Sequence, residues 1–249
     1  MGIAYNGKVI VPDCVGGLCL DGKVIARSPD SGGLCLDGET IVKVGGAPKQ
    51  YALVSTGTQW IDTGVSFDSD KNNSIKMEVK LQLIGNERVL HGSGAFLNQR
   101  FYFGRSSTAE TAVWQVGIGA SATTNTNDRI DYNIHTFIYE YNGENSQWKL
   151  WKNGVLLLAE VYKLSRTNSI FLFAAQSTTG GVSYRGNQKV FGARYWIDNI
   201  LVRDFISVPA GDTTYSITPA PSNCMWDKVT QQYFVNQGTG EFGIEEITG

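Results

Sequence analysis

Residues 75–83 read IKMEVKLQL, and apolar side chains occupy every second position of this stretch. The apolar set is Ile75, Met77, Val79, Leu81 and Leu83, with lysine, glutamate and glutamine between its members. Successive side chains of a β-strand point to opposite faces of a sheet, so this alternation predicts a strand with one buried and one solvated face.

Strand-like segments with turn signals between them continue on both sides of residues 75–83. No long window has the 3.6-residue periodicity of an amphipathic helix. Residues 148–155, WKLWKNGV, predict a hairpin, because Asn-Gly suits the positive φ angles of a tight turn. The predicted strands are 51–55, 60–62, 75–83, 100–103, 114–118, 135–141, 147–152, 155–160, 170–175, 193–198 and 200–207. Many antiparallel strands without helices indicate an all-β sandwich or closed barrel.

The composition disfavours several functional classes. Of the 249 residues, 21 are Lys or Arg and 23 are Asp or Glu, a formal net charge of -2. No basic excess is present to neutralise phosphates, so we expect no nucleic-acid partner. Apolar runs such as residues 155–159 are too short to cross a bilayer, and the N-terminal MGIAYNGKVIV lacks the features of a signal peptide. We expect no membrane partner and no export by the usual secretory route.

The cysteines and histidines point to no metal centre. Cys14, Cys19, Cys35 and Cys224 fit no zinc spacing, and the chain has only two histidines. We interpret the cysteines as buried, reduced thiols.

Residues 1–46 contain a short internal repeat. GGLCLDGKVI at 16–25 returns as GGLCLDGETI at 32–41, and NGKVI at 6–10 is a weaker copy. Each copy places Asn-Gly or Asp-Gly shortly before a β-branched pair, Val-Ile or Thr-Ile, which predicts small type I′ hairpins. A linker at residues 45–48 then separates this arm from a second domain, residues 47–249.

Hairpins this small cannot bury a core of their own. The arm is therefore either a flexible segment with local hairpins or a docking and oligomerising segment. We favour the second interpretation, with Leu18, Cys19, Leu34 and Cys35 buried between subunits, because an exposed Leu-Cys-Leu run would be adhesive. We expect a homo-oligomer, a trimer by analogy with fibre proteins.

Four segments carry a family resemblance. They are residues 51–64 (YALVSTGTQWIDTG), 135–141 with 149–154, 191–197 with 201–208, and 225–242 (MWDKVTQQYFVNQGTGEF). Together they resemble the opening strand, central hairpin, late strands and closing segment of concanavalin A-like (laminin G-like) domains. The resemblance covers roughly residues 50–243. It implies a jelly roll of two antiparallel sheets, and such domains are frequent in phage and prophage structural proteins.

Catalysis is disfavoured. Glycoside hydrolases of this fold need a pair of carboxylates, commonly on one strand as Glu-x-Asp-x-x-Glu, and no such run is present. Glu140 and Glu241 stand without such a partner, and Glu245 and Glu246 are adjacent, so a strand would point them to opposite faces. His91 lies in the turn-like LHGSG at 90–94, and no nucleophile elbow is present. We expect His135 to be structural and the chain not to be an enzyme.

Calcium and sugars are the remaining ligands to weigh. Residues 68–70 (DSD) and 125–128 (NTND) offer oxygen ligands for calcium. The same sequences are typical of Asx turns, and we favour that interpretation. Sugar binding, the common activity of the resembled family, would use aromatic faces and polar side chains. Residues 177–187 form a long polar segment that is either a contact site or an ordinary mobile loop. The candidate ligand-binding residues are Tyr184, Arg185, Trp114, Trp196 and Tyr102.

Three functions are compatible with these observations. The first is a phage or prophage virion surface protein, assembled in the bacterial host cytoplasm. It would attach to other virion proteins through residues 1–46 and display a jelly roll that binds host or mucosal glycans. The second is a purely structural decoration or fibre module, and the third is a divergent glycoside hydrolase.

Overall fold

The computed structural model describes residues 49–87, 90–94, 100–119, 124–176 and 181–247. For residues 90 and 176, and for six short strands between residues 3 and 43, it describes the backbone alone. The chain divides into two compact units, residues 1–49 and 50–249. The described residues form strands, turns and bends and no helix, so they include no helix that could cross a membrane. The prediction of an all-β protein is confirmed.

Three hairpins form in the first unit where the repeat predicts them. The antiparallel pairs are β1 (Ile3–Tyr5) with β2 (Lys8–Pro12), β3 (Leu18–Leu20) with β4 (Lys23–Ile25), and β5 (Gly33–Leu36) with β6 (Glu39–Lys43). An Asn-Gly or Asp-Gly pair connects the two strands of each hairpin. β2 also pairs with β3, which makes one four-stranded sheet of the first two hairpins.

The apolar side chains of this unit, including Leu18, Cys19, Leu34 and Cys35, lie outside the described residues, as does Cys14. The same holds for the predicted linker at residues 45–48. The burial of the arm between subunits therefore stays a prediction.

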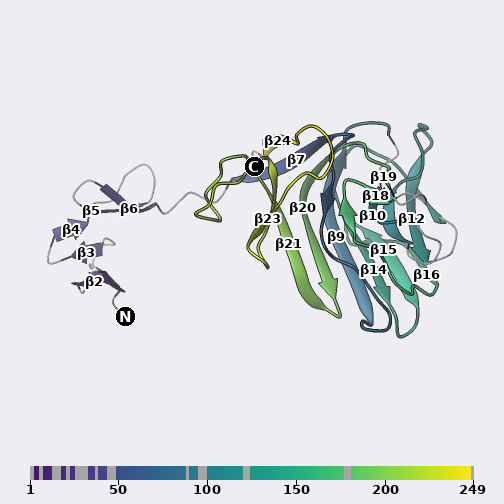
Figure 1. Cartoon of the computed structure of the whole chain (residues 1–249), viewed down its shortest axis with the longest axis horizontal. Helices are drawn as coiled ribbons and strands as arrows, with labels where there is room; N and C mark the ends of the chain where they lie inside the picture. The colour runs from purple at the N-terminus through teal and green to yellow at the C-terminus, as the bar shows by residue number, and fades with distance from the viewer. Residues whose placement is uncertain are drawn as a thin grey trace. The chain divides into compact units, whose positions relative to one another are not determined.

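The second unit is a two-sheet sandwich (Figure 1). Its larger sheet has ten strands, and the alternating residues 75–83 lie in its central strand, β9 (Ser74–Leu83). The order is β16 (Val155–Val161), β15 (Gln147–Lys152), β14 (His135–Asn142), β9, β20 (Asn187–Ile197), β21 (Ile200–Val208), β22 (Cys224–Asp227) and β23 (Gln232–Phe234); β7 (Gln50–Thr56) pairs with β20 and with β24 (Gly243–Ile247).

The smaller sheet has six strands and covers one face of the larger. Its order is β13 (Thr124–Arg129), β12 (Val113–Gly119), β11 (Arg100–Arg105), β10 (Leu90–Ser93), β17 (Phe171–Leu172) and β8 (Ile61–Asp62). A separate hairpin pairs β18 (Ala175–Gln176) with β19 (Val182–Ser183). All described strand pairs are antiparallel, which confirms the predicted jelly-roll sandwich.

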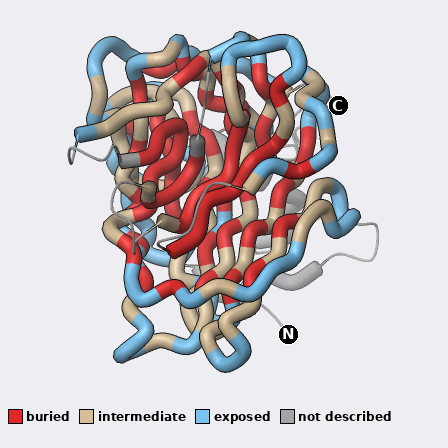
Figure 2. The backbone as a smooth tube through the Cα atoms, turned by 90° about the vertical axis from the view of Figure 1, so that its right-hand side faces the viewer, coloured by how far each residue is buried: buried red, intermediate tan, exposed pale blue. Residues whose placement is uncertain are grey.

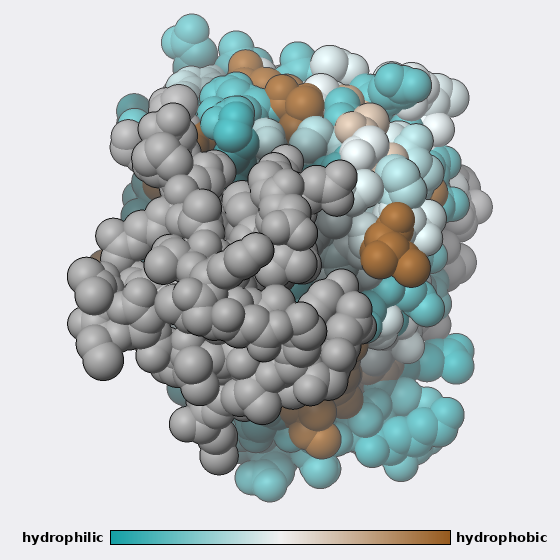
Figure 3. Space-filling view, turned by 90° about the vertical axis from the view of Figure 1, so that its left-hand side faces the viewer, coloured by the Kyte–Doolittle hydropathy of each residue, from teal (hydrophilic) through white to brown (hydrophobic). Residues whose placement is uncertain are grey.

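The core lies between these two sheets, as the buried residues in Figure 2 show. Ile75, Met77, Val79, Leu81 and Leu83 are all at most 2 % exposed, so the predicted buried face of β9 is confirmed. Aromatic rings join the sheets across the core, because Phe101 of β11 stacks on Tyr139 of β14 with ring centroids 4.3 Å apart. The described side chains in Figure 3 are mostly hydrophilic, and apolar ones form small separate groups.

Several local predictions are corrected by the structure. Residues 90–94 are not a turn, because Leu90–Ser93 form β10 between β11 and β17. The predicted strand 170–175 is interrupted where Phe173 adopts a φ of 66° and its N–H turns to the His91 ring. β20 begins at Asn187, six residues before the predicted start. The sequence pattern missed this part of the strand because Gln188 is polar, although the structure buries it against His91. Residues 124–129 form strand β13, which sequence patterning missed because its residues are polar.

Cys224 is free and buried in β22, as predicted. Burial raises the pKa of its thiol to about 12, so this cysteine is unreactive at neutral pH.

Candidate functional site

Two of the five candidate sugar contacts are packed inside the protein. Trp114 is 1 % exposed in β12, with its ring centroid 4.3 Å from that of Phe137. Tyr102 is 4 % exposed in β11, where its ring lies across Gly117 and packs with Ala175. Neither ring has a free face for a ligand, so both assignments are wrong. Sequence spacing could not reveal the elements that cover these rings.

Tyr184 and Arg185 follow β19 and are half-buried. Tyr184 has a φ of 60° and packs against Tyr102 and Ala175. Arg185 donates from Nη1 to the carbonyl of Thr58, 3.2 Å away. Residues 177–180 of the proposed contact segment lie outside the described residues. The structure thus groups Tyr184 with Tyr102 and directs Arg185 to a neighbouring turn.

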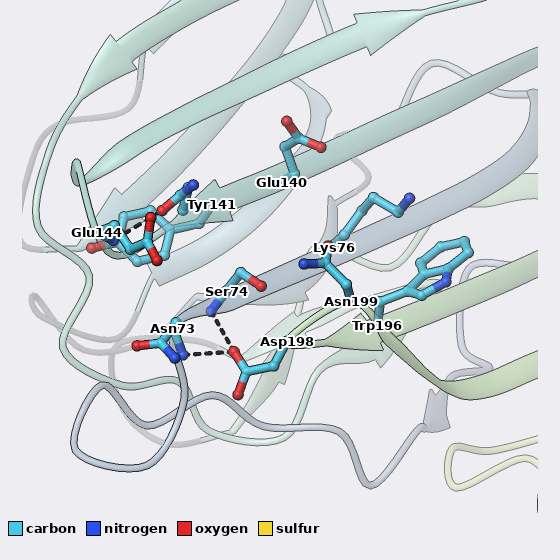
Figure 4. A pocket seen from close by; sticks show the side chains of 10 residues that line it. Asn73, Ser74, Lys76, Glu140, Tyr141, Glu144, Trp196, Asp198 and Asn199 are labelled. Atoms are coloured by element: carbon cyan, nitrogen blue, oxygen red, sulfur yellow. Dashed lines mark hydrogen bonds between the residues drawn. The ribbon is translucent and has the colours of Figure 1, made fainter.

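Trp196 has a different environment, because it lies half-buried on the outward face of the larger sheet. The inward face of β20 at this point is occupied by Tyr195, which is fully buried. Trp196 is paired with Lys76 of β9, and Lys76 is paired with Glu140 of β14. These three outward side chains therefore form a row across adjacent strands, close to where the strands end (Figure 4).

A groove of about 370 Å³ opens beside this row. It is lined by Asn73, Ser74, Lys76, Glu140, Tyr141, Asn142, Glu144, Trp196, Asp198 and Asn199. Eight of these ten residues are polar or charged, so the lining offers many hydrogen-bond donors and acceptors beside one indole ring. The volume lies within the range of small-ligand sites, which is roughly 300–1,000 Å³.

Turn chemistry holds the rim of the groove in place. Asp198 and Asn199 have φ values of 51° and 64° and form the tight turn between β20 and β21. The Asp198 carboxylate accepts the backbone N–H groups of Asn73 (2.6 Å) and Ser74 (2.8 Å). Burial alone would raise the pKa of Asp198, but these hydrogen bonds and one from Asn72 lower it below its usual range. Asp198 thereby anchors the segment before β9 to the end of β20.

Charge alternates along this sheet face. Glu78, Arg194, Asp204 and Lys228 form a chain of ion pairs at 3.3, 3.3 and 3.6 Å. Lys76 places its Nζ 3.9 Å from the ring centroid of Trp196. Within the described residues, neither Lys76 nor Glu140 has an ion-pair partner. The groove therefore has charged groups at Lys76, Glu140 and Glu144 that could hydrogen-bond a ligand.

The sequence pointed to Trp196 but missed its neighbours in the groove. Lys76 and Glu140 occupy outward positions of strands whose alternation was clear, so the period-two pattern alone identifies their face. Which strands lie beside β20 follows from sheet order, and no local pattern contains that order.

Both histidines are buried and hydrogen-bonded to other side chains. His91 is 1 % exposed, and its Nε2 lies 2.7 Å from the Gln188 side-chain oxygen. His135 Nε2 lies 2.6 Å from Asp131, whose other carboxylate oxygen accepts from Lys152 at 3.0 Å. This arrangement agrees with the structural role predicted for His135.

The candidate calcium segments act as turns and ion pairs. Asp68 accepts the N–H of Asp70 in an Asx turn, and Asp128 accepts from Lys152 Nζ at 2.8 Å. The part of the chain that the structure describes contains no cluster of three or more His, Cys, Asp or Glu side chains suited to a metal ion.

Comparison with known proteins supports the fold. No protein-family model matches the sequence, and no curated protein matches it. A solved structure of a proposed carbohydrate-binding protein from Bacteroides ovatus is similar over 94 % of this chain and 68 % of its own, with a TM-score of 0.54 and 9 % identity.

Two further solved structures are more distant. The CBM40 module of the Ruminococcus gnavus IT-sialidase is similar over 62 % of this chain and 92 % of its own, with a TM-score of 0.41 and 12 % identity. A galectin from Caenorhabditis elegans is similar over 61 % and 99 %, with a TM-score of 0.38 and 11 % identity. At these identities the similarity concerns the fold alone.

Proposed function

We propose that this protein binds carbohydrate through the groove beside Trp196. The observation that carries the proposal is one half-buried indole, on the outward face of the sandwich, in a groove whose other lining is almost entirely polar. An apolar ligand would find little to contact there. A sugar presents C–H groups on one side and hydroxyls around its edge, and these match a ring and a set of polar groups.

The chemistry of the groove suits hydroxyl groups. The Glu140 and Glu144 carboxylates can accept from a hydroxyl, and the Lys76 ammonium can donate to one. The ammonium rests over the Trp196 ring, but an exposed cation–π contact stabilises by only about 0.5–1 kcal/mol. Lys76 can therefore turn from the ring to a ligand when a sugar stacks on the indole.

Binding without turnover is part of the proposal. Glu140 and Glu144 both line the groove, which is the one observation that favours a hydrolase instead. Glu144, however, lies exposed in the turn after β14, where a carboxyl is solvated. We expect no release of reducing sugar from common β-glucans or host polysaccharides.

The proposed biological setting is the surface of a phage or prophage particle. The resemblance of residues 50–243 to domains of phage structural proteins supports this setting. The hairpin arm would attach the protein to other virion proteins, and the sandwich would bind host or mucosal glycans. Several copies on one particle would offset a weak affinity at each site. A structural decoration module that binds no sugar is the alternative.

A glycan array with the full chain tests the proposal. We expect binding to a subset of glycans and its loss in Trp196→Ala. The matched control is Phe191→Ala, because Phe191 is a half-buried aromatic of the same strand that lies beneath Lys80 and outside the groove. Retention of binding by Trp196→Ala would move the site elsewhere, and no binding by the wild-type chain would support the decoration module.

A further inference from the structure

A second tryptophan lies on the same outward face as Trp196. Trp151 of β15 is half-buried, and the neighbours along its strand, Trp148 and Leu150, are oriented to the core and at most 1 % exposed. Trp151 is paired with Ile138 of β14 and with Leu156 of β16. Its ring lies near Lys149 Nζ, 5.6 Å from the centroid, as Trp196 lies near Lys76.

Sheet order and register place the two rings at opposite ends of one strip. The strands run β15, β14, β9, β20, so three strand spacings separate Trp151 from Trp196. The row through Trp151 reaches Arg194 on β20, two residues from Trp196. With about 4.8 Å between strands and about 3.4 Å per residue, the two tryptophans are roughly 16 Å apart. No single sugar ring spans that distance.

Apart from Ile138, the strip between the rings is polar, and its charges alternate. Lys149, Glu140 and Lys76 follow one another across β15, β14 and β9. On the next row Glu78 pairs with Arg194 at 3.3 Å. The strip thus carries three cations, Lys149, Lys76 and Arg194, against the carboxylates of Glu140 and Glu78, and its end in the groove adds the carboxylates of Glu144 and Asp198. A chain of acidic sugars would meet Glu140 and Glu144 without a surplus of cations.

We propose that the ligand is an oligosaccharide of uncharged sugars that lies across β15, β14, β9 and β20 and stacks on Trp151 and Trp196 at its two ends. This inference rests on the proposed function, because it extends the same site. The polar strip supplies donors and acceptors to the hydroxyls between the stacked ends. The occupant is a glycan and not a protein, because the strip between the two rings is mostly charged, whereas the centre of a protein interface is depleted in charge.

Calorimetric titration of the full chain tests this. The probes are neutral cello-, malto- and N-acetylchito-oligosaccharides, from the monosaccharide to the hexasaccharide, with sialyllactose and oligogalacturonates as acidic counterparts. For the neutral series that binds, we expect affinity to rise with length, by roughly tenfold between the disaccharide and a chain that reaches both rings. We expect the acidic probes to bind more weakly than neutral ones.

Single substitutions separate the two ends. Trp151→Ala should weaken the longest neutral ligand by roughly fivefold and leave the disaccharide unchanged. Trp196→Ala should weaken both, and Phe191→Ala neither. Circular dichroism and a thermal melt confirm that each variant is folded.

The results distinguish the two-tryptophan ligand from sugar binding at Trp196 alone. Affinity that does not depend on length, a Trp151→Ala variant that binds the long ligand normally, or tighter binding of the acidic probes would overturn the inference while the groove at Trp196 stays a sugar site. Failure of the folded wild-type chain to bind any probe, together with a blank glycan array, would overturn both.

Discussion

His91 shows at the scale of one residue how burial changes a side chain. Its ring stacks on Phe103 with centroids 5.4 Å apart, and Nδ1 accepts the backbone N–H of Phe173 at 3.3 Å. Nε2 is therefore the protonated nitrogen and donates to Gln188. Burial lowers the pKa of His91 to about 4, although the hydrogen bond with Gln188 acts in the opposite direction.

This shift predicts a pH dependence of stability. An unfolded histidine has a pKa near 6.5, so the unfolded chain binds more protons than the folded chain between about pH 6.5 and 4. The free energy of unfolding should fall as the pH decreases through that window. Urea denaturation at a series of pH values measures this slope. His91→Leu should be less stable at pH 7 but should lose most of the slope, and an equal slope in both proteins would contradict the assignment.

Arg105 is a buried cation, and within the described residues its hydrogen bonds go to uncharged oxygens. It is 1 % exposed at the end of β11, and its three nitrogens donate to the surrounding loops. The acceptors are the carbonyls of Ser107, Ala109, Gly85 and Thr108, the Asn86 side chain and the Tyr132 hydroxyl, at 2.6–3.4 Å.

Arg105→Met should therefore destabilise the fold, because it removes six hydrogen bonds that hold the surrounding loops to the end of β11. We expect a loss of about 3 kcal/mol in the free energy of unfolding, measured by chemical denaturation. Arg194→Lys is the control, since Arg194 is 50 % exposed and its ion pairs contribute little. A change below 1 kcal/mol in Arg105→Met would show that water replaces the guanidinium.

At the scale of elements, two glycines separate turn geometry from close packing. Gly154 has a φ of 81° in the β15–β16 turn, and a Cβ there would meet nothing within 4 Å. Gly92, which the sequence suggested was part of a turn, lies inside β10 with a φ of 137°, and a Cβ there would lie 2.1 Å from the Phe101 carbonyl oxygen.

We therefore expect Gly154→Ala to lower the free energy of unfolding by about 1 kcal/mol, from backbone strain alone. Gly92→Ala should cost about 3 kcal/mol or more, because it combines the same kind of strain with a clash against backbone of the paired strand. Thermal and urea denaturation of the two variants measure the difference. Equal losses would mean that β10 and β11 separate readily, contrary to their place inside the smaller sheet.

At the scale of the whole molecule, the arm is predicted to set the oligomeric state. Its repeat places two Leu-Cys-Leu runs on hairpins, and burying one leucine contributes about 1.5–3 kcal/mol. Identical arms can cover one another, and closed symmetry is the usual result. Light scattering should find the full chain larger than a monomer, a trimer by analogy with fibre proteins, and residues 47–249 monomeric.

Two results would contradict that expectation in different ways. If both chains are monomers at micromolar concentration, the arm is a docking segment for another particle protein. If both are the same oligomer, the interface lies on the sandwich and the arm has no part in it.

Strands whose pattern is local could be predicted from the sequence. Alternation at residues 75–83 and the Asn-Gly and Asp-Gly turns predicted β9, β15, β16 and the arm hairpins, because side-chain period and turn conformation depend on neighbours along the chain. Trp196 was also named from the sequence as a candidate contact, and its part in binding stays a prediction.

Which aromatic rings are exposed, and which strands are neighbours, depends on tertiary packing. Trp114 and Tyr102 are buried because packing from other elements covers their rings, while Trp196 and Trp151 stay on an outward face. The groove exists because β14, β9 and β20, which are far apart in sequence, are adjacent in the sheet. Sheet order is a long-range property that depends on how all the strands bury their apolar faces together, and no segment contains it alone.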